Sequence, residues 1–112
     1  MKARVLEEYR SAYPNPISFV VGDAVLIGSL DDEYPGWIRV KTADGNEGWA
    51  PMKYLKKSDS SVAVATVDYS AQELNAVEGE CVEVLQHYGG WAWCLNARGE
   101  RGWLPTGVLQ NA

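Results

Sequence analysis

Apolar and polar residues alternate in short runs along the 112 residues of the chain. Period-two alternation bounded by glycine, asparagine or aspartate is typical of β-strands with one buried face. The pattern predicts strands at residues 4–6, 24–28, 37–41 and 48–51 of the first half, and at 62–67, 81–86, 91–96 and 101–104 of the second. Since no stretch of ten or more residues has helical spacing, the pattern predicts an all-β chain.

Glycine turns punctuate the predicted strands in the same way in both halves. Asp44-Gly45-Asn46 and Arg98-Gly99 each stand between the last two strands of a half, where they predict tight hairpins. Gly22 and Gly79 precede the central strands and are predicted to be turn residues, because glycine alone adopts positive φ without strain.

The two halves also repeat the same motifs in the same order. Gly48-Trp49-Ala50-Pro51 corresponds to Gly102-Trp103-Leu104-Pro105, and Gly36-Trp37 to Gly90-Trp91, both at a spacing of 54 residues. Glu8-Tyr9 corresponds to Asp68-Tyr69. Ordered repetition of this kind indicates a duplication. We therefore expect two small domains, residues 1–57 and 58–112, whose polar linker at residues 56–61 reaches at most about 20 Å.

Alternation further predicts which tryptophans face away from the core. Ile38 and Val40 share one face of their strand, which leaves Trp37 on the other, and Trp91 is placed in the same way. Because a large exposed aromatic side chain needs a reason, we expect these two residues to belong to binding surfaces. Trp93 is expected to pack against the first half or a second chain, which suggests a joint cleft between the halves as one hypothesis.

The net charge of −5 changes the range of expected partners. Residues 1–57 hold eight basic and eight acidic side chains, whereas residues 58–112 hold two basic and seven acidic ones. Nucleic-acid binding needs a basic face, so we expect no nucleic-acid partner in spite of the many aromatic residues.

Targeting and redox features point to the cytoplasm. The first ten residues contain no unbroken apolar run and no stretch of the chain is apolar enough for a membrane helix, so neither a signal peptide nor a membrane partner is expected. Cys81 and Cys94 lie in apolar strand-like runs, and we expect both to be free thiols in a reducing compartment.

Catalytic chemistry is not expected. His87 is the only histidine, and no serine or cysteine nucleophile stands at a motif spacing from it. The two cysteines are thirteen residues apart without a metal-binding pair motif, and Gly89-Gly90 is predicted to be a turn and not a phosphate loop. The chain is therefore predicted to be no enzyme and to need no cofactor or metal.

Taken together, the motifs resemble those of the Src homology 3 (SH3) family, in particular its bacterial variants, and the resemblance covers nearly the whole chain. The family runs Ala-Leu-Tyr-Asp-Tyr, a long loop, an apolar residue, Gly-Asp, a Trp and Gly-x-x-Pro-x-x-Tyr. The first copy has Val5-Leu6-Glu7-Glu8-Tyr9, Ile17, Gly22-Asp23, Trp37 and Gly48-Trp49-Ala50-Pro51-Met52-Lys53-Tyr54 in those places, and the second has Ala65-Thr66-Val67-Asp68-Tyr69, Leu74, Gly79-Glu80, Trp91 and Gly102-Trp103-Leu104-Pro105-Thr106-Gly107-Val108. The resemblance implies two tandem small five-stranded SH3-like β-barrels.

By the same resemblance each barrel carries an aromatic groove for an extended, proline-rich peptide, whose stiff polyproline II form loses little entropy on binding. The residues implied are Tyr9, Trp37, Trp49, Pro51 and Tyr54 in the first copy, with Asp31, Asp32 and Glu33 for a basic ligand residue, and Tyr69, Trp91, Trp103 and Pro105 in the second.

Three departures from the family pattern lead to an alternative. Glu7 and Val67 replace the first tyrosine of the motif in the two copies, and Val108 replaces the last tyrosine in the second. The second groove is therefore expected to be degraded, and peptide binding is expected at the first copy. The alternative is a structural or regulatory tandem domain with vestigial grooves, which acts through domain packing or as a homo-oligomer.

Overall fold

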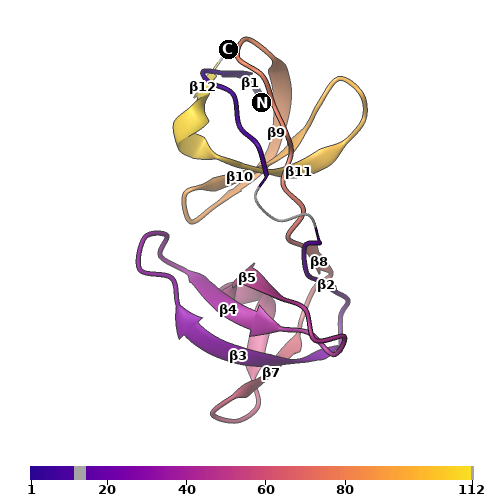
Figure 1. Ribbon diagram of the computed structural model, residues 1–112. Helices are drawn as coiled ribbons and strands as arrows, with labels where there is room; N and C mark the ends of the chain where they lie inside the picture. Colours follow the sequence, from indigo (N-terminus) through magenta and orange to yellow (C-terminus); the bar gives the residue numbers. More distant parts are fainter. Residues whose placement is uncertain (12–14, 112) are drawn as a thin grey trace. The chain divides into compact units, whose positions relative to one another are not determined.

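The computed structural model describes residues 1–11 and 15–111, and this part of the chain is all-β without an α-helix (Figure 1). Its strands are short, as the turn spacing predicts. The elements are β1 (Lys2–Val5), β2 (Ser18–Phe19), β3 (Ala24–Leu30), β4 (Trp37–Lys41), β5 (Glu47–Pro51), the 3-10 helix η1 (Met52–Tyr54), β6 (Leu55–Lys57), β7 (Val62–Ala65), β8 (Tyr69–Ser70), β9 (Cys81–Tyr88), β10 (Trp91–Leu95), β11 (Arg101–Pro105), η2 (Thr106–Val108) and β12 (Leu109–Asn111).

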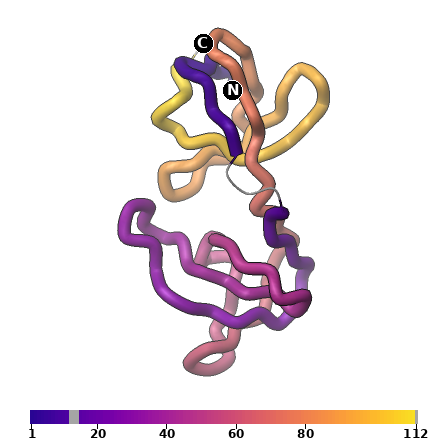
Figure 2. Tube along the Cα trace, viewed as in Figure 1, coloured from indigo at the N-terminus to yellow at the C-terminus, as the bar shows by residue number. Residues whose placement is uncertain are grey.

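Two five-stranded antiparallel sheets contain most of these strands, and each sheet takes one strand from the opposite repeat. The first has the order β11-β10-β9-β1-β12, so β1 of the first repeat pairs with strands of the second. The other has the order β5-β4-β3-β7-β6, so β7 of the second repeat pairs with strands of the first. In Figure 2 the indigo N-terminal segment accordingly runs beside the orange and yellow segments of the second repeat.

The chain divides into two compact units that follow this exchange. Unit 1 consists of Met1–Pro14 and Gln72–Ala112, and unit 2 of Asn15–Ala71. The compact units thus differ from the predicted domains, residues 1–57 and 58–112, which trace the sequence repeats. The predicted linker at residues 56–61 lies inside unit 2, where residues 58–61 form the turn between β6 and β7.

Local sequence explains why β6 and β7 form a hairpin. The amide of Ser58 donates to the carbonyl oxygen of Val62 at 2.9 Å. The carboxylate of Asp59 accepts from the amides of Ser61 and Val62 at 2.9 and 3.0 Å. Aspartate stabilises tight turns by such bonds to its own backbone, so this four-residue connection directs β7 back along β6.

The core of unit 1 contains side chains from both repeats. Ala3 and Val5 of β1 are buried in one cluster with residues of the second repeat, namely Leu74, Ala76, Val82, Val84, Ala92, Cys94, Leu104 and Val108. In unit 2, Ala63 and Ala65 of β7 are buried in the same manner. Alternation along β1 and β7 therefore aims the small apolar side chains inward, as the sequence pattern predicts, but into the units that the exchange defines.

The all-β class is as predicted, and a two-stranded sheet of β2 and β8 accompanies the two five-stranded sheets, whose closure into barrels stays a prediction. The four predicted strands of each half are present, that at residues 37–41 with the predicted ends and the others with shifted ends. Four short strands, β2, β6, β8 and β12, escaped the sequence analysis because two or three residues are too few to show alternation. The four turn glycines of the hairpins and loops have positive φ, between 84° and 91°, at Gly22, Gly45, Gly79 and Gly99.

Candidate functional site

The β10–β11 and β4–β5 hairpins each present one aromatic face. Directly opposite residues in an antiparallel pair lie on the same side of the sheet. In unit 1 the opposed pairs are Trp91 with Pro105 and Trp93 with Trp103. In unit 2 they are Trp37 with Pro51 and Arg39 with Trp49. The predicted alternation thus assigns Trp37 and Trp91 to the correct face of their hairpins.

In unit 1 this face is completed by a tyrosine of the first repeat. The ring of Tyr9 meets the ring of Trp91 edge-on, with 6.2 Å between centroids and 79° between planes. Edge-to-face packing of this kind is favourable and orients both rings. Tyr9, Trp91 and Pro105 are all half-buried, so each keeps part of its surface exposed. Together with Glu73 we call these residues the Tyr9–Trp91 surface.

Tyr9 is held in place at both ends. Its backbone amide donates to the carbonyl oxygen of Ala76, and the amide of Ala76 donates back to Tyr9, both at 2.9 Å. Its hydroxyl donates to the carboxylate of Glu73 at 2.9 Å. Glu73 is half-buried and belongs to a segment that bridges to β11 at Trp103. Sequence analysis missed Glu73, since only the exchange brings it to Tyr9.

Trp103 and Trp93 pack on each other. Their ring centroids are 5.3 Å apart and the planes make an angle of 61°. Trp103 is buried and Trp93 is half-buried. This contact lies within one hairpin, and packing of Trp93 on the first half or on a second chain stays a prediction. Trp103 is therefore a packing residue, and its place beside a groove stays a prediction.

Tyr69, expected in the groove of the second copy, lies in unit 2. Its hydroxyl donates to the carbonyl oxygen of Trp49 at 2.9 Å. Its ring centroid is 5.2 Å from that of Phe19 and 5.9 Å from that of Tyr54. The structure therefore separates the expected set of Tyr9, Trp37, Trp49, Pro51 and Tyr54: Tyr9 belongs to unit 1 and the other four to unit 2.

The aromatic face of unit 2 is more deeply buried than predicted. The side chain of Trp37 is 4% exposed and that of Tyr69 is 8% exposed, and Pro51 is among the most fully buried residues. Tyr54 is half-buried. The prediction that Trp37 is an exposed indole is thus wrong. Alternation identifies the face of a strand on which a side chain lies, but not whether other segments of the chain cover that face.

Trp49 and the acidic loop are engaged locally. The guanidinium of Arg39 lies 5.5 Å from the ring centroid of Trp49, within cation–π range. The carboxylate of Asp31 accepts from the amides of Glu33 and Tyr34 at 2.7 and 3.0 Å. Asp31 therefore orders its own loop, whereas it was predicted to pair with a basic ligand residue. Glu33 and Asp32 are exposed.

Burial and nearby charge raise the pKa of Tyr34. Its partial burial is the larger cause, followed by the negative charge of Glu33. The carboxylates of Glu33 and Asp31 thus act on the Tyr34 hydroxyl, while pairing of this loop with a basic ligand residue stays a prediction.

A hollow of about 460 Å³ lies in unit 2 beside the paired strands β2 and β8. It is lined by Ser18, Phe19, Val20, Asp23, Asp68, Tyr69 and Ser70. Both carboxylates are engaged: Asp23 accepts from the amide of Val20 at 3.0 Å, and Asp68 from that of Val21 at 2.9 Å. These bonds order the neighbouring loop, so the hollow is explained by turn structure.

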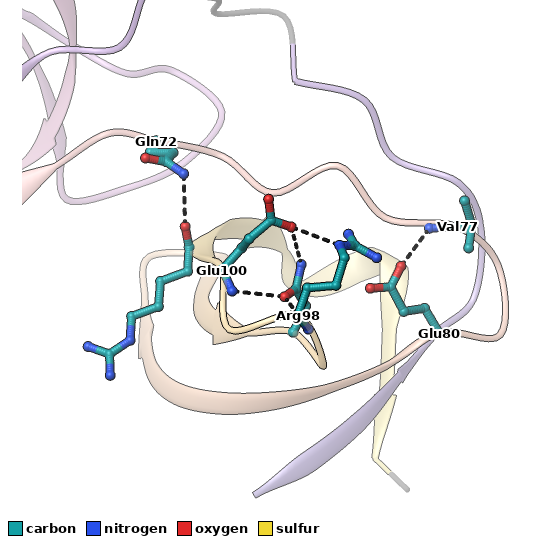
Figure 3. A network of polar contacts seen from close by, with 7 residues as sticks. Gln72, Val77, Glu80, Arg98 and Glu100 are labelled. Atoms are coloured by element: carbon teal, nitrogen blue, oxygen red, sulfur yellow. Dashed lines mark hydrogen bonds and ion pairs between the residues drawn. The ribbon is translucent and has the colours of Figure 1, made fainter.

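A polar network closes the β10–β11 hairpin of unit 1 (Figure 3). Asn96 accepts at Oδ1 from the amides of Arg98 and Glu100, at 3.0 and 2.9 Å, and donates through Nδ2 to the Glu100 carboxylate at 2.8 Å. Arg98 Nε reaches the same carboxylate at 3.0 Å. These bonds, with that from Asn96 as the main cause, lower the pKa of Glu100. The network has a structural role.

The two cysteines differ in exposure. Cys81 is exposed on β9 and Cys94 is buried in the core of unit 1. Burial raises the pKa of the Cys94 thiol to about 11. Both are free, as predicted, although Cys81 is not the buried apolar residue that the sequence suggests.

Comparison with protein families matches both repeats. The model of the variant SH3 domain family matches residues 2–58 and residues 63–112. The chain therefore belongs to the variant SH3 domain family, and domains of this kind generally mediate protein–protein interactions and are typically not catalytic. Neither the comparison with curated proteins nor that with solved structures gives a significant match.

Residues 1–11 and 15–111 contain no group of three or more histidine, cysteine or acidic side chains arranged to hold a metal ion. Within the same residues, no helix has the length and apolar character to span a membrane.

Proposed function

We propose that this chain is a non-enzymatic protein-interaction module that binds an extended, proline-containing peptide on the Tyr9–Trp91 surface of unit 1. The observation that carries the proposal is the contact of the half-exposed rings of Tyr9 and Trp91, with Pro105 directly opposite Trp91. Aromatic rings beside a strand-ending proline form a ridged apolar surface, which suits a preformed polyproline II peptide.

Charge favours a peptide with a basic residue. Unit 1 contains five basic and seven acidic side chains and unit 2 contains five and eight, so the net charges are −2 and −3. The exchange of strands thus removes the charge asymmetry of the repeats and leaves both units acidic. The half-buried Glu73 carboxylate, which already accepts from Tyr9, is the acidic group on the surface itself. A partly exposed ion pair contributes about 0–1 kcal/mol, so it orients a ligand more than it binds it.

Burial in unit 2 supports a second function for that unit. Trp37 and Tyr69 expose 4% and 8% of their surface. A peptide needs open aromatic surface, so this face fits the structural or regulatory alternative, in which aromatic residues stabilise the fold or a permanent assembly. The peptide site predicted on the first copy is accordingly proposed on unit 1 instead.

The test is a titration followed through the five tryptophan indole N–H signals by NMR. A proline-rich peptide with an arginine is expected to shift the Trp91 signal and to leave the Trp49 signal in place. The matched control peptide has the same charge with each proline replaced by alanine. Tyr9→Ala is expected to abolish the Trp91 shift, and Tyr9→Phe to retain most of it because the ring stays. The absence of any shift of the Trp91 indole signal across a broad peptide library would contradict the proposal.

A further inference from the structure

The exchange of first strands has a consequence for binding. We propose that the Tyr9–Trp91 surface is shared between the repeats, so that neither repeat alone provides a complete binding surface. This inference rests on the proposed function for its binding part, while its structural part, the exchange itself, is testable without any ligand. A first strand can pair in two places, beside β9 or beside β3.

Those two places are equivalent in register. On β9, Arg4 of β1 lies opposite Cys81, and on β3, Val64 of β7 lies opposite Ala24. The flanking hydrogen bonds also correspond, since Gly79 donates to the carbonyl of Val5 and Gly22 to that of Ala65, both at 2.8 Å. On the other side, β1 and β7 pair with β12 and β6 in matching registers.

Because the two places are equivalent, the repeats could keep their own first strands without changing a register. In that arrangement Arg4 would lie opposite Ala24, and Val64 opposite Cys81. The internal pairing of each sheet therefore does not decide between the arrangements, and the connections between strands do.

The connection that decides is the turn at residues 58–61. It joins β6 to β7 in four residues, and Asp59 bonds two of its amides. Closing a short loop costs little chain entropy, so β7 pairs with the neighbouring β6 as soon as the turn forms. β7 then fills the place between β3 and β6, and the place between β9 and β12 is left for β1.

Placement of β1 in unit 1 carries Tyr9 to Trp91. Four residues after β1, Tyr9 bridges to Ala76, and its hydroxyl bonds Glu73. The tyrosine that the second repeat has in this motif, Tyr69, is meanwhile buried in unit 2. The surface around Trp91 is thus complete only when the first repeat supplies Tyr9.

Native Cys81 makes a sharp test possible. Arg4 and Cys81 form a non-hydrogen-bonded pair, because the amide of Val5 donates to the carbonyl of Glu80 at 2.8 Å. Such pairs have Cα atoms about 4.5 Å apart, within the range of a disulfide. Both side chains are exposed, so Arg4→Cys is expected to fold. Oxidised glutathione then takes up two electrons and two protons as the two thiols form the bond.

The matched variant is Val64→Cys, which uses the same native cysteine. Val64 is half-buried and lies opposite Ala24. The cysteine introduced at position 64 is therefore expected to form no disulfide with Cys81. The exchange is supported if the monomeric Arg4→Cys protein loses the mass of two hydrogens on oxidation and the peptide map links position 4 to Cys81. A Val64→Cys link to Cys81 would overturn it. So would an unlinked Arg4→Cys protein, or covalent dimers, which would mean that a second chain supplies the strand.

Peptide titration of the oxidised Arg4→Cys protein separates the two parts of the inference. If the surface is shared, the locked protein shows the same Trp91 shift and the same midpoint, within twofold, as the unmodified chain. Loss of that shift in the locked protein alone would overturn the shared surface. A link without any peptide shift in either protein would leave the exchange in place and reject the proposed ligand, and with it the binding part of this inference.

Discussion

Replacement of Gly102 by alanine tests the packing that supports the Trp91 face. A Cβ atom at this position would lie 2.7 Å from the amide nitrogen of Leu74 and 2.8 Å from the carbonyl carbon of Glu73. Both are backbone atoms, so neither can rotate away. The same backbone is fixed to β11 by two hydrogen bonds, from Leu74 to Trp103 at 3.1 Å and from Trp103 to Gln72 at 2.9 Å.

The expected cost follows from these contacts. Overpacking in a tight site costs about 1–3 kcal/mol, and weakening one of the two hydrogen bonds adds about 0.5–1.5 kcal/mol. We therefore expect Gly102→Ala to lower the free energy of unfolding by about 1.5–4.5 kcal/mol. Gly107→Ala is the matched control, because nothing lies within 4 Å of its added Cβ, and it is expected to change stability by less than about 0.5 kcal/mol.

Urea denaturation followed by tryptophan fluorescence measures the difference, and amide hydrogen exchange locates it. Gly48→Ala provides an intermediate case, since its Cβ would meet the side chain of Ile17 at 3.1 Å, and a side chain can yield. Gly102→Ala is therefore expected to cost more stability than Gly48→Ala, and Gly48→Ala more than Gly107→Ala. Equal midpoints for Gly102→Ala and Gly107→Ala would refute it.

Three further predictions follow from the core, the hairpin network and the thiols. Val5→Ala removes buried apolar volume and is expected to cost about 1.5–3 kcal/mol; protection from amide exchange should fall in β9–β11, and a fall confined to β3–β5 would contradict the exchange. Asn96→Ala should raise the pKa of Glu100 towards its usual value in a carboxyl NMR titration, because the hydrogen bond from the Asn96 side chain is the main cause of the lowered pKa. Since that pKa is lowered on folding, the carboxylate stabilises the hairpin above the usual titration range of glutamate, and this contribution disappears as the pH falls through the lowered value; an unchanged pKa would reject the assignment. With a thiol reagent at pH 8, one thiol, Cys81, should react quickly in the native chain and Cys94 only after denaturation, so two fast thiols would contradict the burial of Cys94.

The sequence pattern predicts much of the local structure. Alternation locates eight strands and assigns Trp37 and Trp91 to the correct faces of their hairpins. The repeated motifs identify the family, because turn glycines and the Gly-Trp-x-Pro strands are local features. Such features depend on neighbouring residues, which a sequence displays directly.

The exchange of strands could not be predicted in the same way. β1 and β7 both bury every second side chain, an alanine or a valine, and the places on β9 and β3 have matching registers, so either strand suits either place. The assignment of Tyr9, Tyr69 and Glu73 to their units follows from that choice and was inaccessible for the same reason. The one available signal was the short turn around Asp59, which sequence analysis interpreted as a linker between domains.

The claim on which the proposed surface depends is that β1 lies beside β9. Cross-strand Hα–Hα NOE measurements on the unmodified protein test it most directly, because Hα atoms of a non-hydrogen-bonded antiparallel pair are in close contact. The structure predicts a strong NOE between the Hα atoms of Arg4 and Cys81, and another between those of Val64 and Ala24. Strong NOEs from Arg4 to Ala24 and from Val64 to Cys81 instead would contradict the account.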